Sequence, residues 1–158
     1  MAARRVDGKK RPPDRMPKLL AALREQVAAL PVDRVRVIGG KSMGGRVASL
    51  LAAEAAHELQ IAGVVCLGFP FHRPGKPDNY RAEHLAAIAT PTLILQGQRD
   101  PFGSEAELVG YPLADSVCCR FLNDGEHSFK PRQRSGVTLE QNLACAVTAT
   151  IDFIRSLE

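Results

Sequence analysis

Gly40-Lys41-Ser42-Met43-Gly44 is a G-x-S-x-G pattern, and it joins two stretches of opposite character. The β-branched residues 35–38 before it are typical of a strand, and residues 46–58 after it are good helix formers. A serine on a sharp strand-to-helix turn has a strained backbone, and flanking glycines remove side chains that would collide with the neighbouring elements. The pattern therefore predicts a nucleophile elbow centred on Ser42.

Two other glycine motifs are excluded at this point of the chain. A phosphate-binding P-loop needs glycine five positions before Gly40, where Val35 stands, and a dinucleotide-binding loop needs glycine at Lys41 and Met43. An ordinary glycine-rich turn with a surface serine stays open as the alternative.

Length and composition indicate one globular domain. The chain has 158 residues, of which 45% are hydrophobic and 24% charged, and no apolar run approaches the ~20 residues of a membrane helix. Arg4 and Arg5 follow Met1 without a subsequent apolar stretch, so we expect no secretory signal and no membrane partner.

The positive charge lies at the front of the chain. Residues 1–18 hold seven Lys/Arg and two Asp, a net +5, so the other residues carry about −1 of the total +4. We expect residues 1–16 to be a basic irregular segment, broken by Pro12-Pro13, and residues 17–158 to be a single domain. No aromatic residue interleaves with these charges, so we expect no nucleic-acid partner.

The four cysteines lack C-x-x-C spacing: Cys66, Cys118 and Cys119 fall in apolar strand-like segments, and Cys145 falls in a helix-like one. We expect free buried thiols in a reducing cytoplasm. Adjacent residues of a strand point to opposite faces, so Cys118 and Cys119 predict no metal site.

Three nearly continuous apolar runs predict strands buried on both faces: Ile61–Leu67, residues 92–96 and Val117–Leu122. Helical patterns alternate with them, so the predicted fold is a three-layer α/β/α sandwich around a mostly parallel sheet. A Pro/Gly-rich loop is expected over residues 69–80 and a short helix over 81–89.

Two apolar stripes at helical spacing frame the domain. A helix starting at Pro17 and ended by Pro31 carries Leu20, Leu23, Val27 and Leu30. The last helix begins at Thr138, which forms a capping-box pair with Gln141. Its expected buried face consists of Leu143, Val147, Ile151, Ile154 and Leu157.

A serine hydroxyl needs a base to take its proton and an acid to orient that base. Asp100 follows the strand at residues 92–96, and His127 follows the strand Val117–Leu122. Loops at the carboxyl ends of parallel strands meet at one edge of the sheet, and the chain order Ser, Asp, His is that of α/β-hydrolases. We therefore predict a triad of Ser42, Asp100 and His127.

Other residues compete for the acid and base roles. His57 lies on a helix, and His72 and His84 precede Asp100, so their order fails. Asp124 and Glu126 remain alternatives for the acid, although they share a short loop with the candidate base. A turn role for Asp100 and a surface position for His127 also stay open.

Four motifs resemble the dienelactone-hydrolase-like branch of the α/β-hydrolases. They are G-G-K-S-M-G-G-R at 39–46, L-G-F-P-F-H-R-P-G-K-P from Leu67, P-T-L-I-L-Q-G-Q-R-D-P-F-G from Pro91 and G-E-H-S-F-K-P-R from Gly125. Within that branch the chain is similar to a subfamily that includes a testis-expressed protein and a histone-acetyltransferase complex subunit. The resemblance covers nearly the whole chain.

This resemblance implies Ser42 as nucleophile, Asp100 as acid, His127 as base and the Met43 N–H as an oxyanion donor. It also implies a substrate pocket lined by Phe69, Pro70 and Phe71, and it implies no cofactor or metal. Family members carry further strands and an H-G-x-G-like loop before a stretch like residues 1–17, and that loop supplies a second oxyanion donor. We therefore expect an N-terminally shortened form, or a natural start about 50–60 residues upstream.

The expected function is a serine hydrolase that cleaves a small carboxylic ester, thioester or lactone. The alternative is a non-catalytic or impaired module of the same fold, used for protein–protein contacts. In either case residues 35–38 would form an exposed apolar edge of the sheet, and this predicts a homodimer through that edge.

Overall fold

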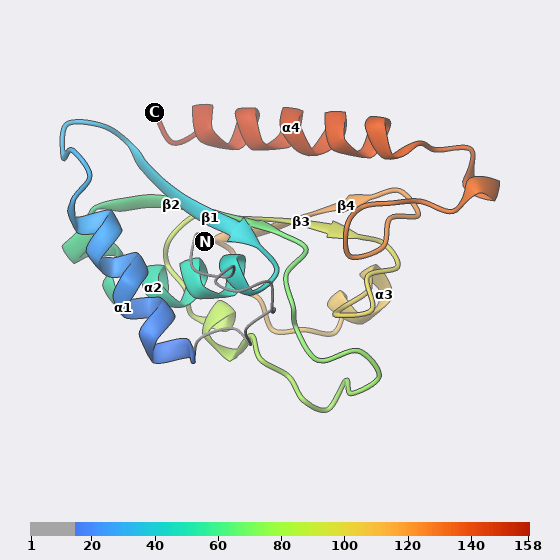
Figure 1. Cartoon of the computed structure of the whole chain (residues 1–158), viewed down its shortest axis with the longest axis horizontal. Coiled ribbons are helices and arrows are strands. Elements are labelled where there is room, and N and C mark those ends of the chain that lie inside the picture. The colour runs from blue at the N-terminus through green and yellow to red at the C-terminus, as the bar shows by residue number, and fades with distance from the viewer. Residues whose placement is uncertain (1–14) are drawn as a thin grey trace, which may run out of the picture.

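The computed structural model describes residues 15–158, and four parallel strands form one sheet in the order β1-β2-β3-β4 (Figure 1). The strands are β1 (Arg36–Lys41), β2 (Ile61–Leu67), β3 (Thr92–Gly97) and β4 (Val117–Leu122). The helices are α1 (Met16–Ala28), α2 (Met43–Leu59), α3 (Glu105–Leu108) and α4 (Leu139–Arg155), with the 3-10 turns η2 (Glu83–Ala86) and η3 (Gln133–Ser135). The predicted α/β fold is confirmed.

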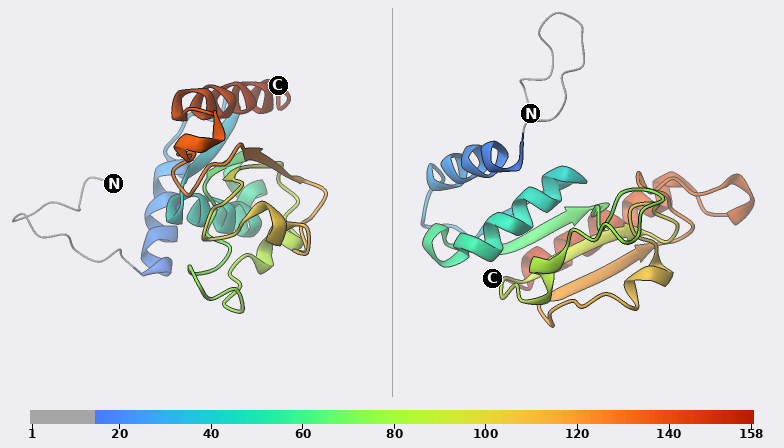
Figure 2. Two further views of the ribbon diagram at one scale, coloured as in Figure 1. Left: turned by 90° about the vertical axis from the view of Figure 1, so that its right-hand side faces the viewer. Right: turned by 90° about the horizontal axis from the view of Figure 1, so that it is seen from below.

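The helices form layers on both faces of the sheet. α4 covers one face, whereas α1, α2, α3 and η2 lie against the other (Figures 1 and 2). Side chains of β2 and β3 alternate between the two cores: Cys66 and Ile94 pack on the α2 side, and Val65, Leu93 and Leu95 on the α4 side. Burial of each such aliphatic side chain contributes about 1.5–3 kcal/mol.

The register brings the carboxyl ends of the strands to one edge. Lys41 pairs with Leu67, Leu67 with Leu95, and Gly97 with Leu122. The loops that follow Lys41, Leu67, Gly97 and Leu122 therefore lie side by side, which is where open parallel sheets place their sites.

The predicted strand boundaries agree closely with the structure except around the elbow. β2 and β4 have the predicted bounds, and β3 extends one residue beyond the prediction to Gly97. β1 continues through the glycines to Lys41, and α2 begins at Met43. Only Ser42 separates the strand from the helix, so the turn is tighter than the predicted interval between residues 38 and 46.

The helix predicted over residues 81–89 is wrong. Only the four residues of η2 are helical. The Arg81 N–H donates to the Phe71 carbonyl at 2.8 Å, and the Leu85 carbonyl accepts from the Ala114 N–H at 2.8 Å. A continuous helix would have paired the Leu85 carbonyl internally with the Ala89 N–H, so the bond to Ala114 replaces a helical one.

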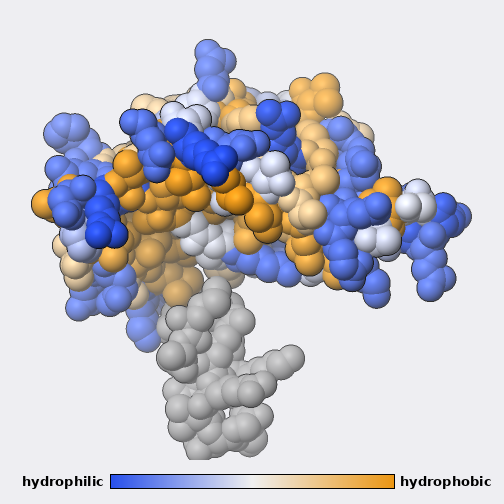
Figure 3. All heavy atoms as spheres, turned by 90° about the horizontal axis from the view of Figure 1, so that it is seen from above, coloured by the Kyte–Doolittle hydropathy of each residue, from blue (hydrophilic) through white to orange (hydrophobic). Residues whose placement is uncertain are grey.

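The start of α4 was predicted correctly, but its buried face only in part, because Ile154 and Leu157 are partly buried and the other three predicted residues are exposed. Thr138 caps it through the predicted capping box with Gln141. Its buried residues are Asn142 and Ala146, whereas Leu143, Val147 and Ile151 are 45%, 58% and 43% exposed. Figure 3 looks onto this side of the molecule and shows a broad area of apolar side chains at the surface.

The first helix and the cysteines also differ in part from expectation. α1 begins at Met16, one residue before Pro17, and buries Val27, while Leu30 beyond its end is 46% exposed. The prediction for the basic segment falls mostly on residues 1–14, outside the described part of the chain.

All four cysteines are free, but only Cys66 is buried, and Cys118 and Cys145 are exposed, so the expectation of buried thiols was wrong for those two.

No helix between residues 15 and 158 combines the length and apolar character that a membrane span requires.

Candidate active site

Ser42 lies between β1 and α2 with φ 52° and ψ −119°. This positive φ is rare for a residue with a side chain and is tolerated only where the surroundings fix it. Two backbone hydrogen bonds do so: the Ser42 N–H donates to the Leu67 carbonyl at 2.8 Å, and its carbonyl accepts from the Arg46 N–H at 3.2 Å. The predicted strand–serine–helix geometry is therefore present.

Gly40 allows the strand and helix to approach at this turn. A Cβ atom on Gly40 would lie 2.8 Å from the Gly44 carbonyl carbon and 3.1 Å from the Gly45 nitrogen, both backbone atoms. Such contacts require the backbone to move, so the conformation of Ser42 depends on a residue without a side chain at this position.

His127 connects Ser42 with Asp100. Its Nε2 lies 2.9 Å from Ser42 Oγ, and its Nδ1 lies 2.8 Å from Asp100 Oδ2. A carboxylate only accepts hydrogen bonds, so this arrangement assigns the ring proton to Nδ1 and leaves Nε2 to accept from the serine hydroxyl. The structure thus brings together the three side chains that the sequence suggested, from the ends of β1, β3 and β4.

Burial differs along this chain of three side chains. The Asp100 side chain has no exposed surface, whereas that of His127 is 17% exposed. Asp100 Oδ1 accepts the Phe102 N–H at 2.8 Å, so both carboxylate oxygens are hydrogen-bonded. The charged end is therefore enclosed by the protein, and the ring faces the surface.

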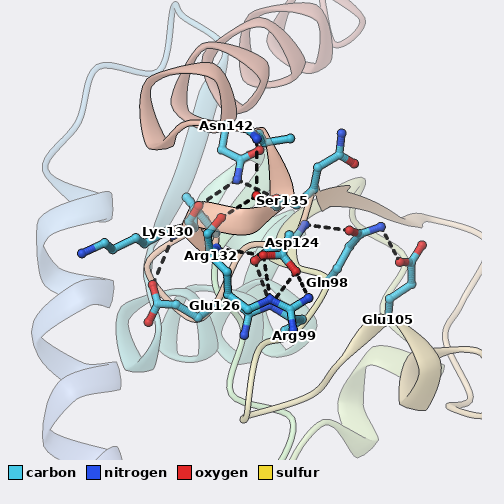
Figure 4. A network of polar contacts seen from close by, with 12 residues as sticks. Gln98, Arg99, Glu105, Asp124, Glu126, Lys130, Arg132, Ser135 and Asn142 are labelled. Carbon is cyan, nitrogen blue, oxygen red and sulfur yellow. Dashed lines mark hydrogen bonds and ion pairs between the residues drawn. The ribbon is translucent and has the colours of Figure 1, made fainter.

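The loop that carries His127 is held by a polar network (Figure 4). Asp124, which has φ 50°, pairs with Arg99 at 2.9 Å and with Arg132, and these partners hold the pKa of its carboxyl well below the usual range. Hydrogen bonding to the side chain and the backbone N–H of Arg132 is the main cause. Glu126 Oε1 instead accepts the Ser128 N–H at 2.7 Å.

These contacts distinguish the three candidate acids by geometry. Asp124 forms ion pairs with two arginines, and Glu126 accepts a hydrogen bond from the backbone of its own loop. Asp100, in contrast, is hydrogen-bonded to the imidazole.

The other histidines have different surroundings. His57 is exposed, and His72 is buried with its Nε2 3.1 Å from Glu107 Oε1. His84 Nε2 lies 2.8 Å from Ser49 Oγ. Burial, with a smaller effect of the nearby Arg46 charge, lowers the pKa of His84 to about 4.

Met43 is the first residue of α2, so its N–H has no acceptor within the helix. The amino end of a helix carries partial positive charge, which favours an anion beside it. The Met43 side chain is 38% exposed.

The residues expected to line a pocket lie in the interior. Phe69 and Phe71 have no exposed surface, their ring centroids are 4.8 Å apart, and Pro70 between them is buried. The aromatic ring that contacts the site is that of Phe102, whose centroid is 4.3 Å from that of His127. A pocket-lining role for Phe69, Pro70 and Phe71 stays a prediction.

Two side chains near Asp100 were missed from the sequence. Phe102 follows Asp100 by two residues in a turn, where an aromatic residue gives no signal of its own. Gln96 is fully buried, and its Nε2 lies 3.0 Å from Asp100 Oδ2. In the sequence, Gln96 appears only as a single polar residue at the end of an apolar run, and this pattern predicts no contact with Asp100.

A cation also lies next to the nucleophile. Lys41 precedes Ser42, and its Nζ donates to Ser128 Oγ at 2.9 Å, so it joins β1 to the loop of His127. Within residues 15–158, no group of three or more His, Cys, Asp or Glu side chains is placed to hold a metal ion.

A parallel sheet between helical layers, with Ser42, Asp100 and His127 at its carboxyl edge, defines the α/β-hydrolase class of fold. The chain belongs to the family described as "Alpha/beta hydrolase domain", which matches it over residues 1–155.

Solved structures of serine hydrolases have the same fold. A serine hydrolase involved in carbazole degradation is 18% identical, with a TM-score of 0.63 over 96% of this chain and 76% of that chain. A putative alpha/beta hydrolase from Agrobacterium tumefaciens is 18% identical, with a TM-score of 0.62 over 98% and 69%. A serine hydrolase without a lid from Xanthomonas campestris is 16% identical, with a TM-score of 0.59 over 96% and 62%. The family and these neighbours together support a hydrolase.

Proposed function

We propose that this protein is a serine hydrolase that cleaves a small carboxylic ester, thioester or lactone through an acyl-enzyme on Ser42. The observation that carries the proposal is the continuous path of hydrogen bonds from Ser42 Oγ through His127 to the buried Asp100, at 2.9 and 2.8 Å. Nucleophile, base and orienting acid in mutual contact are what acyl transfer by a serine requires.

In the first step, Ser42 Oγ attacks the carbonyl carbon while His127 Nε2 takes the hydroxyl proton. The carbon–oxygen or carbon–sulfur bond to the leaving group then breaks, and His127 returns the proton to that group. Water repeats the sequence on the acyl-enzyme and releases the acid. Asp100 keeps the proton on Nδ1 and stabilises the imidazolium that forms in each step.

The negative oxygen of the tetrahedral intermediate needs hydrogen-bond donors. We assign one to the Met43 N–H, because it adjoins Ser42 and belongs to the amino end of α2. Phe69, Pro70 and Phe71 belong to the proposal as residues that shape the substrate site from within the core.

The placement in the dienelactone-hydrolase-like branch is also part of the proposal, and it rests on the motifs around Ser42, Leu67, Asp100 and His127. A cytoplasmic location is proposed with it, because four free thiols suit a reducing compartment.

Hydrolysis of p-nitrophenyl acetate, phenyl thioacetate and a small lactone tests this function. Ser42→Ala and His127→Ala are each expected to lower kcat by about 10³- to 10⁶-fold, with melting temperatures near that of the wild type. His57→Ala, which changes an exposed histidine of α2, is the matched control and should retain full activity. Full activity of Ser42→Ala would eliminate the proposal.

A further inference from the structure

Gln96 is a buried amide that connects the loops around the candidate acid. It is the penultimate residue of β3 and has no exposed surface. Its Oε1 accepts the Phe69 N–H at 2.7 Å. Its Nε2 faces three acceptors: the Phe69 carbonyl at 3.1 Å, the Gly103 carbonyl at 2.9 Å and Asp100 Oδ2 at 3.0 Å.

The surroundings determine which end of this amide faces Asp100. Two carbonyl oxygens and a carboxylate oxygen can only accept, and the Phe69 N–H can only donate. Turning the amide over would place an oxygen against three acceptors and leave a buried N–H facing another N–H, at a cost of about 1–3 kcal/mol for each group left unpaired. The donor end is therefore held toward Asp100.

The geometry points to Gln96 as a positioning residue that fixes the Asp100 carboxylate for His127, an inference that rests on the proposed function. Gln96 bonds Oδ2, the same oxygen that accepts from His127 Nδ1, while the Phe102 N–H holds Oδ1. Because both oxygens of Asp100 are hydrogen-bonded, the plane of its carboxylate is fixed. The carboxylate in turn fixes the orientation of the His127 imidazole. Gln96 itself acts only through Asp100.

Gln96 also joins the loop after β2 to the loop that carries Asp100. Its contacts with Phe69 and Gly103 span these two loops. Gly68, next to Phe69, lies against the imidazole: a Cβ there would be 3.2 Å from two atoms of the His127 ring. One amide therefore sets the position of the carboxylate and of the backbone beside the base.

Replacement of Gln96 should affect the chemistry more than substrate binding. In Gln96→Glu the shape is kept, but a second carboxyl group faces Asp100 at hydrogen-bond distance. Two carboxyl groups this close share a proton. The shared proton leaves one negative charge spread over two residues, so Asp100 stabilises the protonated imidazole less, and we expect the acidic limb of the kcat/KM profile to move down by about one pH unit. In Gln96→Leu the loss of a donor should lower kcat about 10- to 100-fold, with KM changed less than about twofold.

The experiment measures kcat, KM and their pH dependence for p-nitrophenyl acetate, together with the rate of fluorophosphonate labelling and the melting temperature. Thr92→Val is the matched control, because Thr92 is a fully buried polar residue of the same strand whose hydroxyl donates to the Thr90 carbonyl, away from Asp100. It should lower the melting temperature without moving the pH profile. Gln96→Glu keeps the test decisive if Gln96→Leu fails to fold.

A pH profile and kcat of Gln96→Glu equal to those of the wild type, with Ser42 labelled in both, would overturn the positioning role and leave the proposed function intact. Labelling that persists in Ser42→Ala would instead overturn the proposed function and this inference together. A shifted acidic limb in Gln96→Glu, unmatched by Thr92→Val, would support the assignment.

Discussion

Asp100 and Asp124 have similar chemistry and different surroundings, and this separates their roles. Asp100 is enclosed and bonded to the imidazole, while Asp124 pairs with Arg99 and Arg132 on the loop of His127. Loss of the group that orients the base typically costs about 10⁴-fold in kcat, whereas Asp124 supports the loop through arginines that are 36% and 46% exposed and has no contact with the imidazole in this network.

We therefore expect Asp100→Asn to lower kcat for ester hydrolysis by about 10⁴-fold, and Asp124→Asn to lower it by less than about tenfold. Steady-state kinetics at saturating p-nitrophenyl acetate measures both. Equal losses in the two variants would mean that the network around Asp124 supplies the acid.

His84 makes the stability of the fold depend on pH. Burial lowers its pKa to about 4, from about 6.5 in an unfolded chain. Between those two values the unfolded state binds more protons than the folded state, so stability falls as the pH falls from 6.5 toward 4. His84→Gln removes this titration and can still bond Ser49 Oγ, so its melting temperature should fall less between pH 7 and pH 4.5. An equal fall in the melting temperatures of the wild type and of His84→Gln would refute this role of His84. His57→Gln, at an exposed histidine, is the control.

The candidate triad was predictable from the sequence, but its support was not. Ser42, Asp100 and His127 follow three strands in a fixed order, and parallel strands bring their carboxyl ends to one edge. Gln96 bonds Phe69 across 27 positions of the chain, a contact that no local pattern encodes.

At the scale of elements, α4 shows what an apolar stripe does and does not predict. The stripe at Leu143, Val147 and Ile151 identified a helix correctly, yet the residues that this helix buries are Asn142 and Ala146. Helical periodicity indicates that one face is apolar, but another element must be present to bury that face. β2 and β3 were predicted more accurately because they are buried on both faces, so their burial does not depend on which face points inward. β4 has the predicted bounds, but Cys118 and Arg120 are exposed, so the prediction that this last strand of the sheet order is buried on both faces was wrong.

Substitutions on α4 test this orientation. Val147→Lys changes a residue that is 58% exposed and should alter the free energy of unfolding by less than about 0.5 kcal/mol. Ala146→Asp puts a charge at a position that is 6% exposed and should lower the free energy of unfolding by about 3 kcal/mol or more. Urea unfolding gives both values. A larger loss for Val147→Lys would mean that the predicted face is the buried one.

At the scale of the whole molecule, β1 is at one edge of the sheet that residues 15–158 form. Val35, just before β1, is 47% exposed, and an apolar edge strand can pair with another chain. The homodimer predicted from the sequence therefore remains a proposal. We expect sedimentation velocity at tens of micromolar to show a dimer that Val35→Lys shifts toward monomer, because lysine discourages pairing at edges.

Val109→Lys is the control for self-association, because Val109 is 88% exposed and follows α3, in the connection between β3 and β4 and not next to β1. A wild-type protein that stays monomeric, or a dimer that Val35→Lys leaves unchanged, would argue against pairing through β1.

Mass spectrometry of the protein after reaction with a fluorophosphonate tests the proposed role of Ser42 most directly. Such a probe phosphonylates a serine only where a base removes the hydroxyl proton, so it reports the Ser42–His127 pair without a known substrate. We expect one adduct, on the peptide that contains Ser42, and its loss in Ser42→Ala and His127→Ala. A folded protein without an adduct, or with the adduct on another serine, would contradict this role.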